Sequence, residues 1–421
     1  QGVHLTQPPP CGLTCSSAEA PLSSAPLLDW LPDLSAVSYE IEIFRERPEN
    51  IDTDAPDERA VFRTAEIYTN AIQLSCGDFL PDLPEGTPLW WRVRSLNLEQ
   101  QAISPFSELV PLYLDPGLPS MQAPVIYSPY NQGYGSVLLY PVYTWVRPHG
   151  AARFEIALYD ENPAQTAATM PIDLLFSEST ECYDPTPRIG ERPFYWRVRA
   201  LDSDGAPLGD WSEPGSFRTA PSDGWEVAVF GDSISHGGGH ISYGPENLEY
   251  SWLRYLAFPA LNLSQSGNLT EDMLARFERD VIPFHPRYLL IMGGSNDLRS
   301  GDFTVDTVRE NMEAIKEKCR QYGIKPIFLT LPPINPQKIA RAFDEPTDPR
   351  WQEKFAVFND YLRCQPHIDV AATFAAYAAD GKLPEWLALD GLHQDILGKK
   401  LIAARVNAQW EEAKETADNW P

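Results

Sequence analysis

The sequence has few positive charges. Its 33 lysines and arginines are outnumbered by 59 aspartates and glutamates, which gives a formal net charge of −26 at pH 7. A surface this acidic repels phosphate backbones and anionic lipid headgroups. We therefore expect no nucleic-acid partner.

The sequence also lacks a long apolar run. No stretch reaches the length of about 18 apolar residues that predicts a transmembrane helix, so we expect no membrane span. The six cysteines include no C-x-x-C pair of the kind that serves zinc binding or redox chemistry. Cys11 and Cys15 are close enough in sequence to bridge, and the disulfide pairing stays open.

The chain begins at Gln1 without an initiator methionine. We interpret this as the removal of a leader sequence. Together with the modules described next, it predicts a secreted, periplasmic or cell-surface protein of bacterial type.

Proline is abundant and concentrated in the N-terminal half, where two segments repeat each other. Trp30 and Trp91 of the first segment match Trp145 and Trp196 of the second. Apolar residues alternate in YEIEI and WRVRA, which predicts strands with one packed and one solvated face. The order of the Trp, Tyr/Phe, Trp-Arg-Val-Arg and Trp-Ser elements resembles bacterial fibronectin type III-like modules.

That resemblance implies two all-β sandwiches. We place them at residues 20–116 and 117–220, after an N-terminal extension at 1–19. Such modules act as spacers or docking surfaces, or contact a polysaccharide or a cell surface directly. The sequence does not decide between these roles.

After about residue 220 the pattern changes to short apolar runs that alternate with amphipathic segments. The runs EVAVF, PALNLS, RYLLIM, KPIFLTL and HIDVA predict buried parallel strands. Thr304 and Gly323 are placed to cap a helix between the third and fourth runs. We expect a three-layer α/β/α domain over 225–421, with its functional groups at the carboxyl ends of the strands.

Short polar blocks at those strand ends supply the groups that covalent ester hydrolysis needs. Ser233 is the hydroxyl nucleophile and His393 the base. Asp390, three positions before the histidine, can orient its ring. The backbone N–H groups of Ser233 and Gly267 and the side-chain amide of Asn296 form the expected oxyanion hole.

The four blocks resemble, in content and order, those of the SGNH hydrolases, the GDSL-type esterase and lipase superfamily; they lie at 231–233, 262–267, 294–297 and 390–393. The resemblance spans about residues 225–415. It implies a flavodoxin-like α/β/α fold, hydrolysis of acyl esters through a serine intermediate, and no metal or other cofactor. Two departures are Ile234-Ser235, where the family often has Leu-Thr, and Gln394, where proline is usual.

The string HGGG at 236–239 is one that lipases use for an oxyanion hole. Those enzymes have a G-x-S-x-G elbow downstream of it, and none follows here. We interpret its glycines as a loop at the mouth of the site, with His236 or His240 either contacting substrate or merely exposed. Arg299 either binds an anionic group of the substrate or forms a local salt bridge. Asp297 is interpreted as a structural carboxylate.

The leading functional hypothesis is an esterase that removes acetyl or similar acyl groups from a glycan. One alternative is a lipid hydrolase of the lysophospholipase or thioesterase type. Another is a glycan-binding or adhesion protein with an inactive hydrolase domain. The sequence leaves open the acyl chain length, the leaving alcohol and the oligomeric state.

Overall fold

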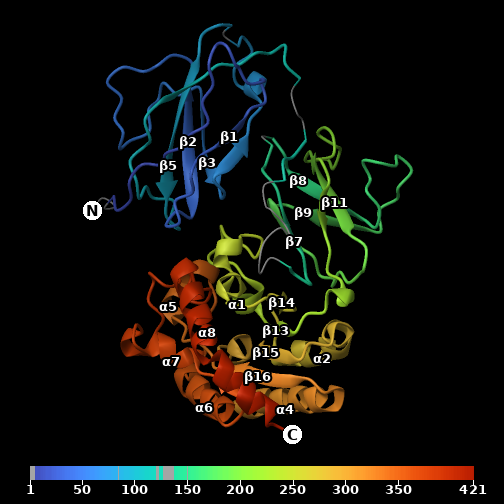
Figure 1. Cartoon of the computed structure of the whole chain (residues 1–421). Helices are drawn as coiled ribbons and strands as arrows, with labels where there is room; N and C mark the ends of the chain where they lie inside the picture. Colours follow the sequence, from blue (N-terminus) through green and yellow to red (C-terminus); the bar gives the residue numbers. More distant parts are fainter. Residues whose placement is uncertain (1–4, 84, 120–122, 127–136, 149) are drawn as a thin grey trace.

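A computed structural model describes residues 5–83, 85–119, 123–126, 137–148 and 150–421 of the chain. Gln1, on which the expected leader rests, lies outside the described residues, as do short parts of the second expected module. Two β-rich units and one domain that contains a sheet and most of the helices make up the structure (Figure 1).

The C-terminal domain is built on a five-stranded sheet whose strands are all parallel. Its strands, in sheet order, are β14 (Leu261–Asn262), β13 (Val227–Gly231), β15 (Tyr288–Met292), β16 (Lys325–Leu329) and β17 (His367–Ile368). The parallel sheet predicted from the apolar runs is therefore confirmed. The strand order is consistent with a flavodoxin-like fold, in which the second strand of the domain lies at the sheet edge, outside the first.

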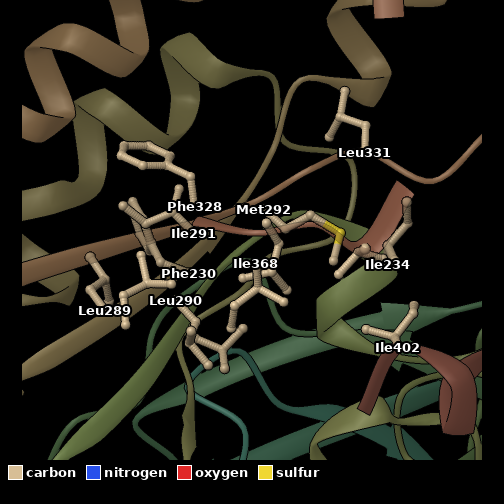
Figure 2. Packing of buried hydrophobic residues seen from close by; sticks show 14 of the residues in the cluster. Phe230, Ile234, Leu289, Leu290, Ile291, Met292, Phe328, Leu331, Ile368 and Ile402 are labelled. Atoms are coloured by element: carbon tan, nitrogen blue, oxygen red, sulfur yellow. The ribbon is translucent and has the colours of Figure 1, made fainter. Parts of the chain in front are cut away.

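Helices flank this sheet. α2, α4 and α6 pack in sequence against one another, whereas α8 packs on β16 and β17. The helices are α1 (Ser233–His236), α2 (Thr270–Asp280), α3 (Ser295–Leu298), α4 (Val305–Tyr322), α5 (Pro336–Phe343), α6 (Trp351–Arg363), α7 (Val370–Ala375) and α8 (Ile396–Asp418). Figure 2 shows apolar side chains of the sheet gathered in one cluster, with Ile234 and Ile402 at one side of it.

The caps predicted for the helix that follows Thr304 are confirmed. The Thr304 side chain accepts a hydrogen bond from the backbone N–H of Thr307 at 3.2 Å, and Gly323 ends α4 with φ 72°. A left-handed residue at this position favours glycine, because any other side chain is strained there.

The repeat in the sequence is a repeat in the structure. The first β unit has a four-stranded antiparallel sheet, β3-β2-β5-β6, and a β1-β4 pair; the second has β9-β8-β11-β12 and a β7-β10 pair. The bounds are β1 (Leu27–Asp29), β2 (Ser38–Phe44), β3 (Phe62–Ile67), β4 (Ala71–Gln73), β5 (Leu89–Leu96), β6 (Val110–Leu112), β7 (Val142–Thr144), β8 (Arg153–Tyr159), β9 (Asp173–Ser177), β10 (Glu181–Tyr183), β11 (Phe194–Leu201) and β12 (Gly215–Phe217).

Each β unit has its own buried core, around Trp91 in the first and Trp196 in the second. The matched tryptophans thus belong to cores rather than to an exposed stacking surface. Before the first unit, Thr14 accepts a hydrogen bond from the Trp91 indole at 2.9 Å, so this part of the N-terminal extension packs on the unit. The fibronectin type III-like assignment and the module boundaries stay predictions.

A short segment of the chain before β7 ties the second β unit to the C-terminal domain. Leu138 pairs in parallel with Asn262 of β14, and the N–H of Leu139 donates to the carbonyl of Asn262 at 3.0 Å. The segment therefore continues the sheet beyond its edge strand. Leu139 and Tyr140 are buried in the core of the C-terminal domain. We call residues 137–140 the edge segment.

Tyr140 anchors the edge segment with its hydroxyl. It hydrogen-bonds to the buried carboxylate of Asp280, and the guanidinium of Arg279 donates to the same hydroxyl at 2.7 Å. Asp280 also pairs with Arg276 at 3.2 Å. The second β unit and helix α2 therefore share one buried polar network.

Replacing Tyr140 by phenylalanine should destabilise the C-terminal domain. The change keeps the ring and removes a buried hydrogen bond to a charged group, which costs about 1–3 kcal/mol. Chemical denaturation monitored by circular dichroism measures the loss. Tyr322→Phe, at a partly exposed tyrosine of α4, is the matched control and should change stability little; an equal effect of the two substitutions would contradict the role given to Tyr140.

Candidate active site

Ser233 follows the carboxyl end of strand β13. The strand ends at Gly231, and the Asp232 side chain caps α1 by accepting from the N–H of Ile234 at 3.0 Å. Ser233 is the first residue of that helix. Gly231 is required by close packing, because a Cβ at this position would lie 2.4 Å from the carbonyl oxygen of Met292. The glycine lets β13 and β15 end side by side.

The hydroxyl, imidazole and carboxylate expected from the sequence lie in one hydrogen-bonded line. Ser233 Oγ is 2.8 Å from His393 Nε2, and His393 Nδ1 is 2.7 Å from Asp390 Oδ2. Because the carboxylate accepts a hydrogen bond from Nδ1–H, Nε2 is left as the acceptor for the serine hydroxyl. This arrangement can draw the proton from Ser233 during nucleophilic attack.

Asp390 is held as a carboxylate although it is buried. Burial raises its pKa, but the charge of His393 and hydrogen bonds from His393 and Leu392 outweigh burial and leave the pKa below its ordinary value. The backbone N–H groups of His393 and Leu392 donate to its Oδ1 at 2.7 and 2.8 Å. The second oxygen is thereby free to face the imidazole.

The three expected oxyanion donors line one cavity with the triad. Ser233 opens α1, and the first N–H groups of a helix have no acceptor within the helix. Gly267 has φ 82°, and a Cβ built on it would meet open space. Asn296 donates one amide hydrogen to the carbonyl of Asn268 at 3.0 Å, which leaves the other hydrogen of its amide for a ligand.

The cavity has a volume of about 340 Å³. Ser233 and His393 lie in its wall with Asn296 and Gly267. It thus brings a hydroxyl, an imidazole and N–H donors together in one cavity. These are the parts that acyl transfer requires.

A comparison with protein families assigns the domain that contains this cavity. Residues 229–401 match the model of the GDSL-like lipase/acylhydrolase family. The chain carries a GDSL-like acylhydrolase domain. The enzyme class expected from the four sequence blocks, a carboxylic ester hydrolase, is therefore confirmed.

Individual proteins and solved structures match only part of this chain. The Bacillus subtilis lipoprotein YqeF is 36% identical over 132 residues, which are 28% of this chain and 54% of that protein. The chain thus spans about half the length of this curated relative. Among solved structures, the lipase/acylhydrolase from Enterococcus faecalis matches 47% of this chain and 100% of its own at 22% identity and a TM-score of 0.35. An acetylxylan esterase from Geobacillus stearothermophilus matches 44% of this chain and 94% of its own at 20% identity and a TM-score of 0.35.

His236 is buried and is not among the residues that line the cavity, which corrects the expectation that it either contacts substrate or is merely exposed. Its ring is buried, with Nε2 2.8 Å from the carbonyl of Tyr140 and Nδ1 2.8 Å from the hydroxyl of Ser266. Burial lowers its pKa to about 4, so the ring is neutral at pH 7. The histidine instead joins the edge segment to the loop that holds Gly267.

His240 and Arg299, the other two expected contact residues, both line the cavity. His240 is buried, so the expectation that it is merely exposed was wrong; its ring packs edge-on against Tyr243 with centroids 4.9 Å apart. Arg299 pairs with Glu345 at 2.9 Å and donates to the side-chain oxygen of Asn296 at 3.2 Å. The salt bridge expected as one alternative for Arg299 is present, and the same side chain holds the amide group of Asn296.

Asp297 is placed as a structural carboxylate. Its oxygens accept from the backbone N–H and the hydroxyl of Thr270, the latter at 2.8 Å. The glycines at 237–239 also line the cavity, as expected for a loop at the site. A Cβ on Gly238 would lie 2.7 Å from the carbonyl of Tyr243, so this loop is tightly packed.

Among the cavity residues that escaped sequence reasoning are Glu181, Tyr183, Phe343 and Glu345. Phe343, the last residue of α5, packs edge-on to the His393 ring with centroids 6.1 Å apart. Glu181 and Tyr183 come from β10 of the second β unit. No local motif marks these positions, because each reaches the cavity through packing between distant segments.

Beneath the nucleophile lies a buried charged cluster of Asp232, Asp395 and Lys399. The Lys399 amine donates to the carbonyl of Ile234 at 2.9 Å. Burial raises the pKa of Asp232 to about 6 and that of Asp395 to about 7, and it lowers the pKa of Lys399 to about 8. The acylhydrolase domain thus keeps titrating groups next to the short helix that begins with Ser233.

Asp395 should make stability depend on pH. Since its pKa in the folded protein is raised, to about 7, its contribution is complete below the ordinary aspartate pKa and is lost as pH rises through about 7. The unsubstituted protein should therefore lose stability between about pH 5 and about pH 8. The free energy of unfolding of Asp395→Asn should fall less over this range, by roughly 2 kcal/mol, and its melting temperature should fall correspondingly less. Differential scanning calorimetry measures both slopes. Asp302→Asn, at an exposed loop position, should keep the parent slope, and an unchanged slope in Asp395→Asn would show that Asp395 does not titrate in this range.

Proposed function

We propose that the protein is a serine esterase that removes short acyl groups, acetyl above all, from a carbohydrate. Ser233 is the nucleophile, His393 the base and Asp390 the carboxylate that orients the base. The observation that carries this proposal is the continuous line of hydrogen bonds of 2.8 and 2.7 Å through the two nitrogens of His393.

The chemistry follows from that line. Ser233 Oγ attacks the ester carbonyl while His393 Nε2 takes its proton, and the negative charge on the carbonyl oxygen is stabilised by the N–H groups of Ser233 and Gly267 and by the Asn296 amide. His393 then returns the proton to the leaving alcohol, which leaves an acyl-serine. A water that gives its proton to His393 attacks this acyl group and frees the acid.

The size and chemistry of the cavity favour a small acyl group. A volume of about 340 Å³ lies near the lower end of the range for ligand pockets, about 300–1,000 Å³. A lysophospholipid or long-chain thioester needs a long apolar groove beside the serine. The side chains around the cavity include the polar groups of Glu181, Arg299 and Glu345, which suit a polar substrate better than an alkyl chain.

We also propose that the protein is exported. The relative from Bacillus subtilis bears the name of a lipoprotein. Among the described helices, none combines the length and the apolar character that a membrane crossing requires. An esterase outside the cytoplasm would meet acetylated polysaccharide directly.

Replacing either reacting residue should remove nearly all turnover. Ser233→Ala and His393→Ala are each expected to lower kcat by about 10³-fold or more on p-nitrophenyl acetate, because the two residues act as one unit. Spectrophotometric release of nitrophenol measures the rate. His285→Asn, at an exposed histidine of the same domain, should retain the parent rate. Substantial activity in Ser233→Ala would exclude the acyl-serine route.

Asn296→Ala should lower kcat about 10²- to 10³-fold with a much smaller change in KM. The reason is that an oxyanion donor acts mainly in the transition state. Steady-state kinetics separate the two constants. Asn419→Ala near the C-terminus, where the asparagine is exposed, is the matched control; a rise in KM alone would assign Asn296 to ground-state binding instead.

A further inference from the structure

The second β unit supplies part of the wall of the catalytic cavity. Glu181 and Tyr183 of β10 line the same cavity as Ser233 and His393. In a strand, residues two apart point to the same face. Cys182 between them belongs to the core of the β unit, so the two flanking side chains point away from that core and toward the acylhydrolase domain.

β10 is held in this place by a continuous backbone connection to the catalytic sheet. β10 pairs with β7 through Tyr183 opposite Val142 and Glu181 opposite Thr144. β7 directly follows the edge segment, which is hydrogen-bonded to β14. A shift of β10 would therefore require breaking sheet pairing on one side or the other.

Side-chain contacts with the acylhydrolase domain also hold β10 in place. The Tyr183 ring lies 6.1 Å from the His236 ring. Glu181 hydrogen-bonds to Tyr183 and to Glu246, which lies in the loop that follows α1. A Cβ on Gly244 would lie 2.2 Å from Glu181 Oε2, so the loop accepts this carboxyl group only because position 244 is a glycine.

The first β unit shows that these two residues are not demanded by the fold. Its β4 strand is the counterpart of β10, and the matching register pairs Gln73 with Leu27 and Ala71 with Asp29. Gln73 and Ala71 therefore stand where the second unit has Tyr183 and Glu181. The acidic and aromatic pair occurs in the unit whose strand reaches the cavity.

An aromatic ring beside a carboxyl group suits a sugar ring. The hydroxyls of a sugar donate to carboxyl oxygens, and its apolar C–H face packs on an aromatic side chain. Beside the cavity lies a groove of about 1100 Å³ between the β units and the acylhydrolase domain. Glu181, Ile241 and Tyr243 line both spaces, so a longer saccharide has room to continue from one into the other.

We propose that Tyr183 and Glu181 are specificity-determining residues that bind the alcohol part of the ester, a sugar ring, so that the second β unit is a component of the active site. This inference rests on the proposed esterase function. The second β unit would then contact the substrate next to the reacting ester, whereas a docking module would bind the polysaccharide away from the active site.

Kinetics of the full-length protein on two esters test the proposal. p-Nitrophenyl acetate and acetylated xylo-oligosaccharide share the acyl group and differ in the alcohol. Tyr183→Ala and Glu181→Gln should each lower the ratio of kcat/KM on the oligosaccharide to kcat/KM on the aryl ester by about tenfold or more. Tyr183→Phe keeps the ring and should retain most of that ratio.

Controls come from the same β unit. Phe176→Ala removes a half-exposed aromatic ring of β9, and Glu161→Gln neutralises an exposed carboxylate; neither lines the cavity. Both should keep the parent ratio. Circular dichroism and the melting temperature of each variant show whether it is folded.

Several results would overturn the inference. One is that Tyr183→Ala and Glu181→Gln are both folded and both keep the parent ratio of kcat/KM values. Another is that kcat/KM falls equally on the oligosaccharide and on the aryl ester. Failure of the unsubstituted protein to hydrolyse the oligosaccharide would also overturn it. Failure of the proposed function is distinguishable, because in that case Ser233→Ala would retain activity on the aryl ester itself.

Discussion

The parallel alignment of five strands is the constraint on which the site depends. Because parallel strands place their carboxyl ends at one edge, the loops after β13, β14 and β15 deliver Ser233, Gly267 and Asn296 to the same cavity. His393 arrives from the turn before α8, 160 positions after the serine. Each strand end contributes one group, and the sheet sets their spacing.

Residues from outside the C-terminal domain also contact the edge of the sheet where the site lies. The edge segment continues the sheet on the β14 side, and His236 links the carbonyl of Tyr140 to the loop of Gly267. Gly267, a proposed oxyanion donor, therefore lies on a loop that is held by a contact from the edge segment. On the opposite side of the cavity, Arg299 braces Asn296.

The sequence predicted the parts that short motifs encode. Ser233, Asp390 and His393 are recognisable because each reacting group sits in a compact block beside an apolar run, and the local chain geometry brings Asp390 to His393. The parallel sheet was predictable for the same reason, since its buried strands are continuous apolar runs. Capping of α4 by Thr304 and Gly323 depends only on residues at its own ends.

What the sequence did not predict depends on contacts between distant segments. His236 stands beside the nucleophile in sequence, yet it is buried because Tyr140, nearly a hundred positions earlier, covers it. Glu181 and Tyr183 have an ordinary strand pattern, and only the pairing of the edge segment with β14 turns them toward the cavity. Pairing across such separations is not written in any local pattern.

The edge segment also bears on what counts as a domain in this chain. A fragment that starts near residue 225 would contain all four catalytic blocks, but it would leave the outer side of β14 unpaired and open the space that Leu139 and Tyr140 fill. An open strand edge beside exposed apolar surface is a template for self-association. Removing the edge segment is therefore expected to expose both a strand edge and part of the apolar core of the C-terminal domain.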